Sequence, residues 1–313
     1  MPSDMLRTCQ YPLKNETAVE FEEKKSDNEK TETLIPVEAK KELSRKNYEI
    51  VTILAESQFN KVIRIRDTSC RDLVAKVIDI ARASKIYGIE LSVSKLSVLR
   101  QIRHKYVNSV YEIIVSSKNV IILMKYQPKR TLVNMIASWR VIPESTCRII
   151  ASCMLQALHY FHHNLCIAHK HIKLQNFLLS DTMTPKLTDY CYSLRVTSNA
   201  AFGATALSGT YCASLPYTAP EIFESKQCDP RISDIWSFGV CLFFLLNGVY
   251  PFYFDDISIL LNKQLNADFE FTEPLSTECK GILKKMLEPD PKKRITTSQL
   301  ILNPWFLNEK ELP

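Results

Sequence analysis

Apolar and polar residues alternate along the segment that begins near residue 48. The stretches "YEIVTIL", "NKVIRIR" and "DLVAKVIDI" follow one another with the two-residue period of half-buried strands. The stretches "SVYEIIV" and "NVIILMKY" repeat that period after residues 90–104, where apolar positions recur at helical spacing. This part of the chain therefore predicts a small antiparallel sheet accompanied by one long helix.

Helical spacing takes over after Pro128. Apolar stripes run through "RIIASCMLQALHYFHH", "DIWSFGVCLFFLLNG", "ISILLNKQL", "ECKGILKKML" and "TTSQLILNPWF", several of which end near Gly, Asn or Pro. The strongest apolar run, residues 236–246, is too short and too interrupted to span a bilayer, so we interpret it as core and expect no membrane partner. The pattern predicts an α+β fold with a small sheet-containing N-terminal lobe and a larger, mostly helical C-terminal lobe.

The two ends of the chain differ from this pattern. Residues 1–47 contain charged stretches such as "KNETAVEFEEKKSDNEKTE", with few apolar residues to bury, so we expect a disordered charged tail there. The folded domain is expected over residues 48–306, and residues 307–313 are expected to form a short C-terminal tail. The first residues lack the apolar core of a secretory signal, which favours a cytoplasmic location.

Composition narrows the class of partner. The 313 residues are 46% hydrophobic and 24% charged, as in ordinary globular proteins. The net charge of +6 is spread among 34 acidic residues rather than gathered in a block, so no nucleic-acid partner is expected. The 10 cysteines contain no C-x-x-C pair, which favours reduced thiols over a zinc or redox site.

Six short motifs carry the candidate chemistry. In chain order they are "VAK" ending at Lys76, "HKHIKLQN" over 169–176, "TDYC" with Asp189, "APE" at 219–221, "DIWSFG" at 234–239, and "KKRIT" with Arg294. Their order and spacing resemble the signature set of protein kinases over residues 48–306. "KLTDY", "YCASLPYTAPE" and "LEPDPKKRIT" resemble, more narrowly, the calcium/calmodulin-dependent-type group and within it the testis-specific serine kinases.

The resemblance implies part of a site for ATP and Mg²⁺. Lys76 matches the strand lysine that grips the α- and β-phosphates, and Lys173 matches the loop lysine that faces the γ-phosphate. Asn176 and Asp189 match the oxygen ligands of magnesium. The residues implied around the adenine are Val62, Ala75, Leu178 and the connecting segment 124–127, including Met124 and Tyr126. Leu99, Val110, His169 and Tyr190 match an apolar column that supports the site.

The same resemblance shows what has been lost. His171 stands where the family has the catalytic Asp, whose carboxylate orients the substrate hydroxyl and accepts its proton. The glycine-rich loop reads "AESQFN", so side chains hinder the approach of backbone amides to phosphates. Lys95 stands where a Glu should pair with Lys76, and two facing ammonium groups repel.

Other departures point the same way. Lys170 replaces the Arg that clamps a phosphorylated activation segment, and Cys191 replaces the Gly of the magnesium motif. By contrast, Glu221, Arg294 and Asp234 keep the scaffold interactions that the family pattern implies. Residues 189–221 also contain several hydroxyls that another kinase could phosphorylate: Ser193, Thr197, Ser198, Thr205, Ser208, Thr210 and Ser214.

Three functions are compatible with this pattern. We favour a pseudokinase that acts by binding a partner kinase or another protein, with nucleotide as an optional stabiliser. The second is a weakly active serine/threonine kinase in which His171 or mere proximity supports slow transfer. The third is a scaffold that binds no nucleotide. Metal binding by His169 and His171 with His162 and His163 is disfavoured, because no Cys or acid completes a ligand set at the spacing of known metal sites.

Overall fold

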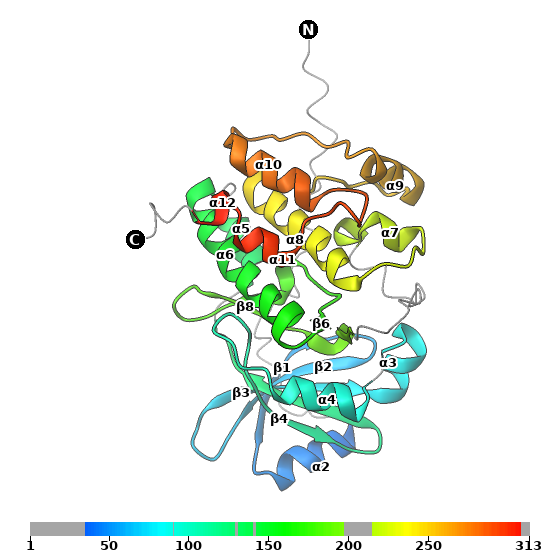
Figure 1. Cartoon of the computed structure of the whole chain (residues 1–313). Helices are drawn as coiled ribbons and strands as arrows, with labels where there is room; N and C mark the ends of the chain where they lie inside the picture. The colour runs from blue at the N-terminus through cyan, green and yellow to red at the C-terminus, as the bar shows by residue number, and fades with distance from the viewer. Residues whose placement is uncertain (1–34, 90, 129–130, 140–141, 197–214, 308–313) are drawn as a thin grey trace.

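The computed structural model describes residues 35–89, 91–128, 131–139, 142–196 and 215–307. A sheet with short helices forms one lobe and a group of longer helices forms the other (Figure 1). The α+β two-lobed fold predicted from the sequence is therefore confirmed.

The N-terminal lobe is built on a five-stranded antiparallel sheet in the order β1-β2-β3-β5-β4. Alternating apolar residues produce these strands, as the two-residue period predicted. Their bounds are β1 Glu49–Glu56, β2 Asn60–Arg66, β3 Asp72–Asp79, β4 Val110–Val115 and β5 Asn119–Lys125.

The two faces of this sheet belong to different cores. Along β3, Ala75 and Val77 belong to the core that contains residues of α2 (Val37–Arg45), whereas Val74 and Ile78 belong to the large core that extends into the helical lobe. This division follows from the pleat, which sends successive side chains to opposite faces. It determines which β3 residues lie on the face of the sheet that is directed toward the helical lobe.

Part of the predicted tail is ordered, which corrects the sequence interpretation. Ile35, Ala39 and Leu43 lie four residues apart, and at most 3% of each residue is exposed, because they pack on the outer face of the sheet. The helix α2 covers that face on the side away from the helical lobe (Figure 1). The sequence interpretation gave more weight to the charged residues of this segment than to the narrow apolar stripe between them. Residues 1–34 lie outside the described part of the chain.

Two short helices replace the single long one expected in this lobe. Asp79 caps α3 (Ile80–Tyr87), and Gly88 ends it in the left-handed conformation with φ of 58°. Ser92 caps α4 (Val93–Arg100), which ends at Gln101. The predicted helix over residues 90–104 is thus shorter at both ends, because polar capping residues define its limits more strongly than the apolar period does.

The C-terminal lobe surrounds α8, whose start is fixed by Asp229 and Pro230 and whose end is fixed by Gly248. Residues 234–236 and 238–247 of α8 are buried, so the apolar run is core, as predicted. Within the described ranges, no helix has the length and apolar character needed to cross a membrane. The helices are α5 Leu132–Trp139, α6 Glu144–His159, α7 Pro220–Phe223, α8 Pro230–Asn247, α9 Ile257–Leu265, α10 Thr277–Met286, α11 Thr297–Ile301 and α12 Pro304–Leu307.

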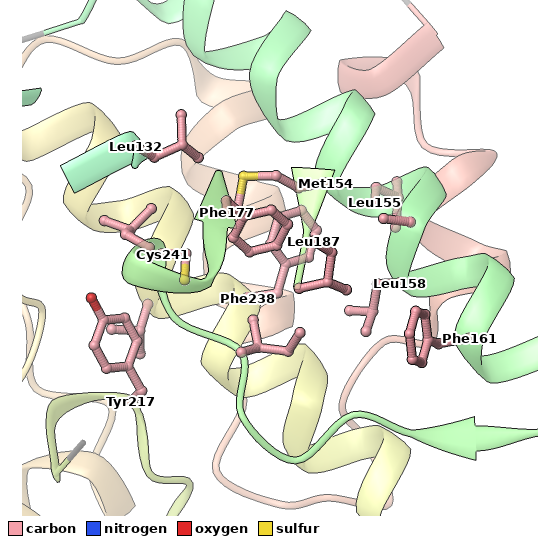
Figure 2. Packing of buried hydrophobic residues seen from close by; sticks show 14 of the residues in the cluster. Leu132, Met154, Leu155, Leu158, Phe161, Phe177, Leu187, Tyr217, Phe238 and Cys241 are labelled. Carbon is pink, nitrogen blue, oxygen red and sulfur yellow. The ribbon is translucent and has the colours of Figure 1, made fainter. Parts of the chain in front are cut away.

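Short strands carry the candidate site on this helical base. Met154, Leu155 and Leu158 of α6 lie close to Phe177 and Leu187 of the adjoining hairpin (Figure 2). This packing anchors the β7–β8 hairpin on α6. The short elements are β6 Ile167–Ala168, β7 Phe177–Leu179, β8 Pro185–Leu187 and β9 Leu194–Arg195, with single helical turns η2 Tyr160–Asn164, η3 Leu174–Asn176, η4 Tyr190–Tyr192 and η5 Leu215–Tyr217.

Candidate active site

Asp234 of α8 holds the loop that follows β6. Its carboxylate accepts hydrogen bonds from the backbone N–H of His169 at 2.7 Å and of Lys170 at 2.8 Å. The His162 ring also lies 3.0 Å from Asp234 Oδ2. Lys170 adopts a left-handed backbone with φ of 64°, which this carboxylate stabilises. The predicted role of Asp234 beneath the loop is confirmed.

A second scaffold interaction ties the segment around α7 to the end of the lobe. Arg294 donates from both terminal nitrogens to the Glu221 carboxylate, at 2.6 and 2.8 Å, and both side chains are fully buried. This is the bidentate geometry that gives Arg–carboxylate pairs their strength. The ion pair expected from the motifs is therefore confirmed.

The centre of the site is a chain of contacts through Asp189. Lys76 Nζ donates to Asp189 Oδ1 at 2.6 Å, and His171 Nδ1 lies 3.2 Å from Asp189 Oδ2. The Asn176 amide donates to the His171 carbonyl at 2.7 Å. Four residues that the sequence implicated thus lie together, and Asp189 joins the lysine to the histidine.

These contacts set the charges of the site. Burial and the nearby Lys173 ammonium lower the pKa of His171 to about 4, against the opposing effect of Asp189, so the imidazole is neutral at neutral pH. Burial alone would raise the pKa of Asp189, but Lys76 and the His171 hydrogen bond hold it well below its usual range. Burial alone would lower the pKa of Lys76, but Asp189 raises it. The site therefore contains an ammonium, a carboxylate and a neutral imidazole.

Lys95 avoids the predicted clash with Lys76 by bonding elsewhere. Its Nζ donates to the backbone carbonyl of Cys191 at 2.5 Å, while Lys76 pairs with Asp189. Cys191 is fully buried, and burial raises the pKa of its thiol to about 11. Lys76 thus bonds to the side chain of Asp189 and Lys95 to the backbone of Cys191, and among the described residues no glutamate pairs with Lys76.

Aromatic rings connect the β1–β2 turn to the loop that bears His171. The rings of Phe59 and Tyr192 meet edge to face with centroids 6.1 Å apart, and those of Tyr192 and His171 lie 4.4 Å apart. Ser57 Oγ accepts hydrogen bonds from the backbone N–H of Phe59 at 3.4 Å and of Asn60 at 3.2 Å. The amides that a glycine-rich loop would offer to phosphates are therefore engaged within the turn itself.

The implied adenine slot needs one correction. Ala75 is fully buried on the α2 face of the sheet, opposite to the face of Lys76, because adjacent strand residues point to opposite sides. Val74, one residue earlier, shares the core with Met124, to which it is directly paired across the β3–β5 ladder. Val74 therefore takes the place that we had assigned to Ala75.

The remaining slot residues keep positions compatible with the prediction. Val62 is paired with Lys76 across the β2–β3 ladder and packs against the large core, as does the half-buried Tyr126. Met124 is buried, and Leu178 of β7 is partly exposed. Their contact with an adenine stays a prediction.

Asn108 braces the connecting segment, which the sequence did not indicate. Its amide donates to the Lys125 carbonyl at 3.1 Å and its Oδ1 accepts from Gln127 Nε2 at 2.9 Å. Its own carbonyl accepts from the Tyr190 hydroxyl, which also donates to Leu187 O at 3.1 Å. Asn108 thus joins the connecting segment to the magnesium motif, although in the sequence it is only a polar residue just before a strand.

The apolar column expected from the resemblance is assembled around Tyr190. Leu99, Val110, His169 and Tyr190 are at most 1% exposed. The His169 and Tyr190 rings meet edge to face at 6.2 Å, and His169 Nε2 lies 3.1 Å from the Thr188 carbonyl. His162 is likewise occupied by Asp234. Among the described residues, no group of three or more His, Cys, Asp and Glu side chains is arranged to hold a metal ion.

Of the candidate phosphorylation sites in residues 189–221, Ser193 lies among the described residues. Ser193 is buried and donates to the Tyr190 carbonyl at 2.7 Å, so it is unavailable to another kinase in this arrangement. Thr197, Ser198, Thr205, Ser208, Thr210 and Ser214 lie outside the described residues.

Comparison with known proteins gives the family. The protein kinase domain family matches residues 48–306. CBL-interacting protein kinase 3 of Oryza sativa subsp. japonica is 31% identical over 267 residues, which cover 85% of this chain and 59% of that protein. CBL-interacting serine/threonine-protein kinase 16 of Arabidopsis thaliana is 31% identical over 265 residues, 83% of this chain and 56% of that protein. The chain spans less than two thirds of either relative, and it belongs to the protein kinase domain family.

Proposed function

We propose that this chain is a pseudokinase, a kinase-like domain that acts mainly by binding a protein partner or by regulating a partner kinase. One observation carries the proposal: His171 takes the place of the catalytic carboxylate, and the carboxylate beside it, Asp189, is bonded to both Lys76 and His171. A phosphoryl acceptor therefore lacks the negative group that would orient it and take its proton. Losing such proton transfer costs about 10² to 10⁴ in rate.

The intact scaffold supports a binding role. The buried Glu221–Arg294 pair and the Asp234 contacts keep both the loop and the segment around α7 in place although the reaction chemistry is depleted. The relatives described above are named for interaction with another protein, which is compatible with a protein partner here. A cytoplasmic location, the absence of nucleic-acid and membrane partners, and the likeness to testis-specific serine kinases remain parts of this proposal that rest on sequence alone.

Nucleotide is included as an optional ligand. Lys76 lies on the same face of the sheet as Val62 and Val74, and Met124 lies on that face too. These residues support an adenine nucleotide, and Lys173 adds positive charge close to His171. ATP and Mg²⁺ are both implied by the family resemblance, and Mg²⁺ fits these residues poorly because both oxygens of Asp189 already contact Lys76 and His171.

A weakly active serine/threonine kinase is the second candidate, and the geometry of His171 favours it. With its Nδ1 proton directed at Asp189, the neutral ring presents Nε2 as its acceptor. Nε2 would take the proton of a substrate hydroxyl while the oxygen bonds to the γ-phosphorus and the bond to the β–γ bridging oxygen breaks, which releases ADP. Imidazole is a poor copy of the carboxylate in shape and charge, so we rank this function second.

Purified protein, radiolabelled ATP and a generic basic protein substrate separate the two candidates. The Lys76→Met variant removes the phosphate-gripping ammonium, and Lys284→Met, at an exposed position on α10, is the matched control. The pseudokinase proposal predicts the same background signal for all three proteins. Transfer that Lys76→Met abolishes and Lys284→Met preserves would establish the weak kinase instead.

A further inference from the structure

Three lysines from different segments of the chain lie close together. Lys186 of β8 donates a hydrogen bond from Nζ to the backbone carbonyl of Lys105. Lys125, the last residue of β5, donates from its backbone N–H to the carbonyl of Ser109 at 3.1 Å. The stretch before β4 therefore bonds to both β5 and β8, and it brings Lys105, Lys125 and Lys186 together. We call these residues the three-lysine surface.

Backbone hydrogen bonds fix this arrangement. The Leu187 N–H donates to the Tyr106 carbonyl at 2.9 Å, and the Asn108 N–H donates to the Leu187 carbonyl at 2.8 Å. The Asn108 side chain also donates to the Lys125 carbonyl at 3.1 Å. The three segments that carry the lysines are thus held side by side by bonds of the kind that join strands.

The ammonium groups of this surface act on one another. Lys105 and Lys125 are exposed, whereas Lys186 is half-buried. Partial burial lowers the pKa of Lys186, and the charges of Lys125 and Lys105 lower it further. Partial burial and the charge of Lys186 likewise lower the pKa of His104. Like charges held this close are unfavourable unless a negative group lies beside them.

The neighbouring segments supply no such negative group. Residues 100–109, β5 and β8 contain no Asp or Glu, and Glu112, the acidic residue of β4, pairs with Lys46. Within the ranges that the structure describes, none of the three lysines forms an ion pair with a carboxylate. Lys105 Nζ lies instead 5.0 Å from the centre of the Tyr106 ring. The surface therefore presents uncompensated positive charge to solvent.

We propose that the three-lysine surface binds an acidic segment of a protein partner, one that carries several Asp or Glu side chains. The proposal rests on the protein-binding role in the proposed function and names the chemistry of the partner. Each ammonium has N–H donors for a carboxylate, and the exposed Lys105 and Lys125 can be reached without moving the backbone. Exposed charges of this kind speed encounter and fix orientation, so the binding depends on salt.

Fluorescence anisotropy with labelled hexaglutamate tests the proposal on the full chain. We expect hexaglutamate to bind at low ionic strength, to lose affinity as salt is added, and to bind more tightly than hexaglutamine. The variant Lys105→Gln/Lys125→Gln/Lys186→Gln should weaken the binding of hexaglutamate by about tenfold, because each exposed ion pair contributes modestly. If hexaglutamate does not bind to the unaltered chain, the proposal is wrong.

A matched control separates this surface from net charge. It removes the same number of charges at exposed positions on and after α10, in the variant Lys284→Gln/Lys285→Gln/Lys292→Gln. The control should bind hexaglutamate as the unaltered chain does. Equal weakening in both triple variants would overturn the proposal. The pseudokinase proposal would still stand, because the phosphotransfer assay that tests it does not involve these lysines.

A second variant keeps the test valid if the first fails to fold, since Lys186 is half-buried and bonded to the Lys105 carbonyl. The variant Lys105→Gln/Lys125→Gln changes exposed side chains only and should weaken binding by about fivefold. The thermal midpoint without peptide reports folding for each variant. An unchanged affinity in the folded double variant would contradict the assignment of these lysines to the partner.

Two other occupants give different results. If the acidic stretch near the start of this chain covered the surface, Glu20→Gln/Glu22→Gln/Glu23→Gln would bind hexaglutamate more tightly than the unaltered chain, and the external partner would be wrong. If an oligodeoxythymidine of equal charge bound as tightly as hexaglutamate and lost its binding in the triple variant of the surface, a general polyanion site would replace the site for an acidic protein segment.

Discussion

Lys76 Nζ lies 2.6 Å from Asp189 Oδ1, so the lysine that the family resemblance assigns to phosphate is paired with the carboxylate assigned to metal. Each of these two groups compensates the charge of the other. The family resemblance places Lys95 of α4 where a glutamate would pair with Lys76, and Lys95 bonds instead to the Cys191 carbonyl. The charged groups of the site are thus bonded to one another or to the backbone, and each contact can be tested by substituting one residue.

Restoring two carboxylates should raise phosphoryl transfer. In the double variant Lys95→Glu/His171→Asp, Lys76 regains an acidic partner on α4 and the acceptor hydroxyl regains a carboxylate base. We expect residual transfer to rise by about 10²-fold or more, measured with radiolabelled ATP. If neither the activity nor the nucleotide affinity changes, these positions do not correspond to the family positions that the motifs suggested.

His171 should make stability depend on pH. Its pKa is about 4 in the folded chain, against an ordinary value of 6.5, so only the unfolded chain binds a proton at this site between those values. Stability from the neutral ring is therefore complete above pH 6.5 and is lost as the pH falls toward 4.

Urea unfolding at several pH values measures this effect against His171→Asn. The difference in unfolding free energy between the two proteins should change by up to about 3 kcal/mol between neutral pH and pH 4. The other histidines titrate in both proteins and cancel in the comparison. A difference that does not vary with pH would mean that His171 is not held neutral by the fold.

Tyr190→Phe should loosen the magnesium motif. The hydroxyl donates to the Asn108 and Leu187 carbonyls in a fully buried setting, and the variant leaves both acceptors without it. We expect a loss of about 1–3 kcal/mol in urea unfolding. Tyr111→Phe, at a position 54% exposed on β4, is the control and should change stability little. Equal stability of the two variants would show that these hydrogen bonds contribute nothing net.

Arg294→Met should destabilise the helical lobe severely. It leaves the Glu221 carboxylate buried without a counter-charge, which typically costs about 3–5 kcal/mol. Lys263→Met breaks the exposed pair with Asp268 and should cost at most about 1 kcal/mol. Comparable unfolding midpoints for the two variants would contradict the view that the buried pair holds the scaffold together.

Leu43→Ala tests whether α2 belongs to the folded domain. Leu43 is fully buried between α2 and the sheet, so the truncation should cost about 2–5 kcal/mol. Val37→Ala, on the same helix at a position 68% exposed, is the matched control. If both variants have the same unfolding free energy as the unaltered chain, α2 is not packed on the sheet in solution, and the disordered tail extends to residue 47 as the sequence predicted.

The two-residue period of the strands and the order of the motifs predicted both lobes. They did not identify correctly which of two adjacent strand residues lies on the face of Lys76. "VAK" contains two apolar residues before the lysine, and the family resemblance implied Ala75 beside the adenine. The pleat puts Val74 on the face of Lys76 instead. Counting by two from the lysine gives the correct residue, so here the physical period was a better guide than residue identity.

Other features could not be predicted because they depend on contacts between distant segments. The ring of Phe59 reaches Tyr192 across 133 positions of the chain, and Asn108 meets Tyr190 across 82. A lone Phe in a turn or a lone Asn before a strand carries no signal of such a partner. The stripe of Ile35, Ala39 and Leu43 was present in the sequence, but the charge around it made disorder the simpler interpretation.

A crystal structure of the chain grown with an ATP analogue and Mg²⁺ would show whether the groups needed for phosphoryl transfer are absent. We expect that Lys76 stays in contact with Asp189 or a phosphate, that His171 keeps its place, and that no carboxylate lies within hydrogen-bonding reach of the position where an acceptor hydroxyl would attack. A magnesium ion held by Asp189 and Asn176, with an acidic side chain directed at that position, would contradict the account of a silenced kinase.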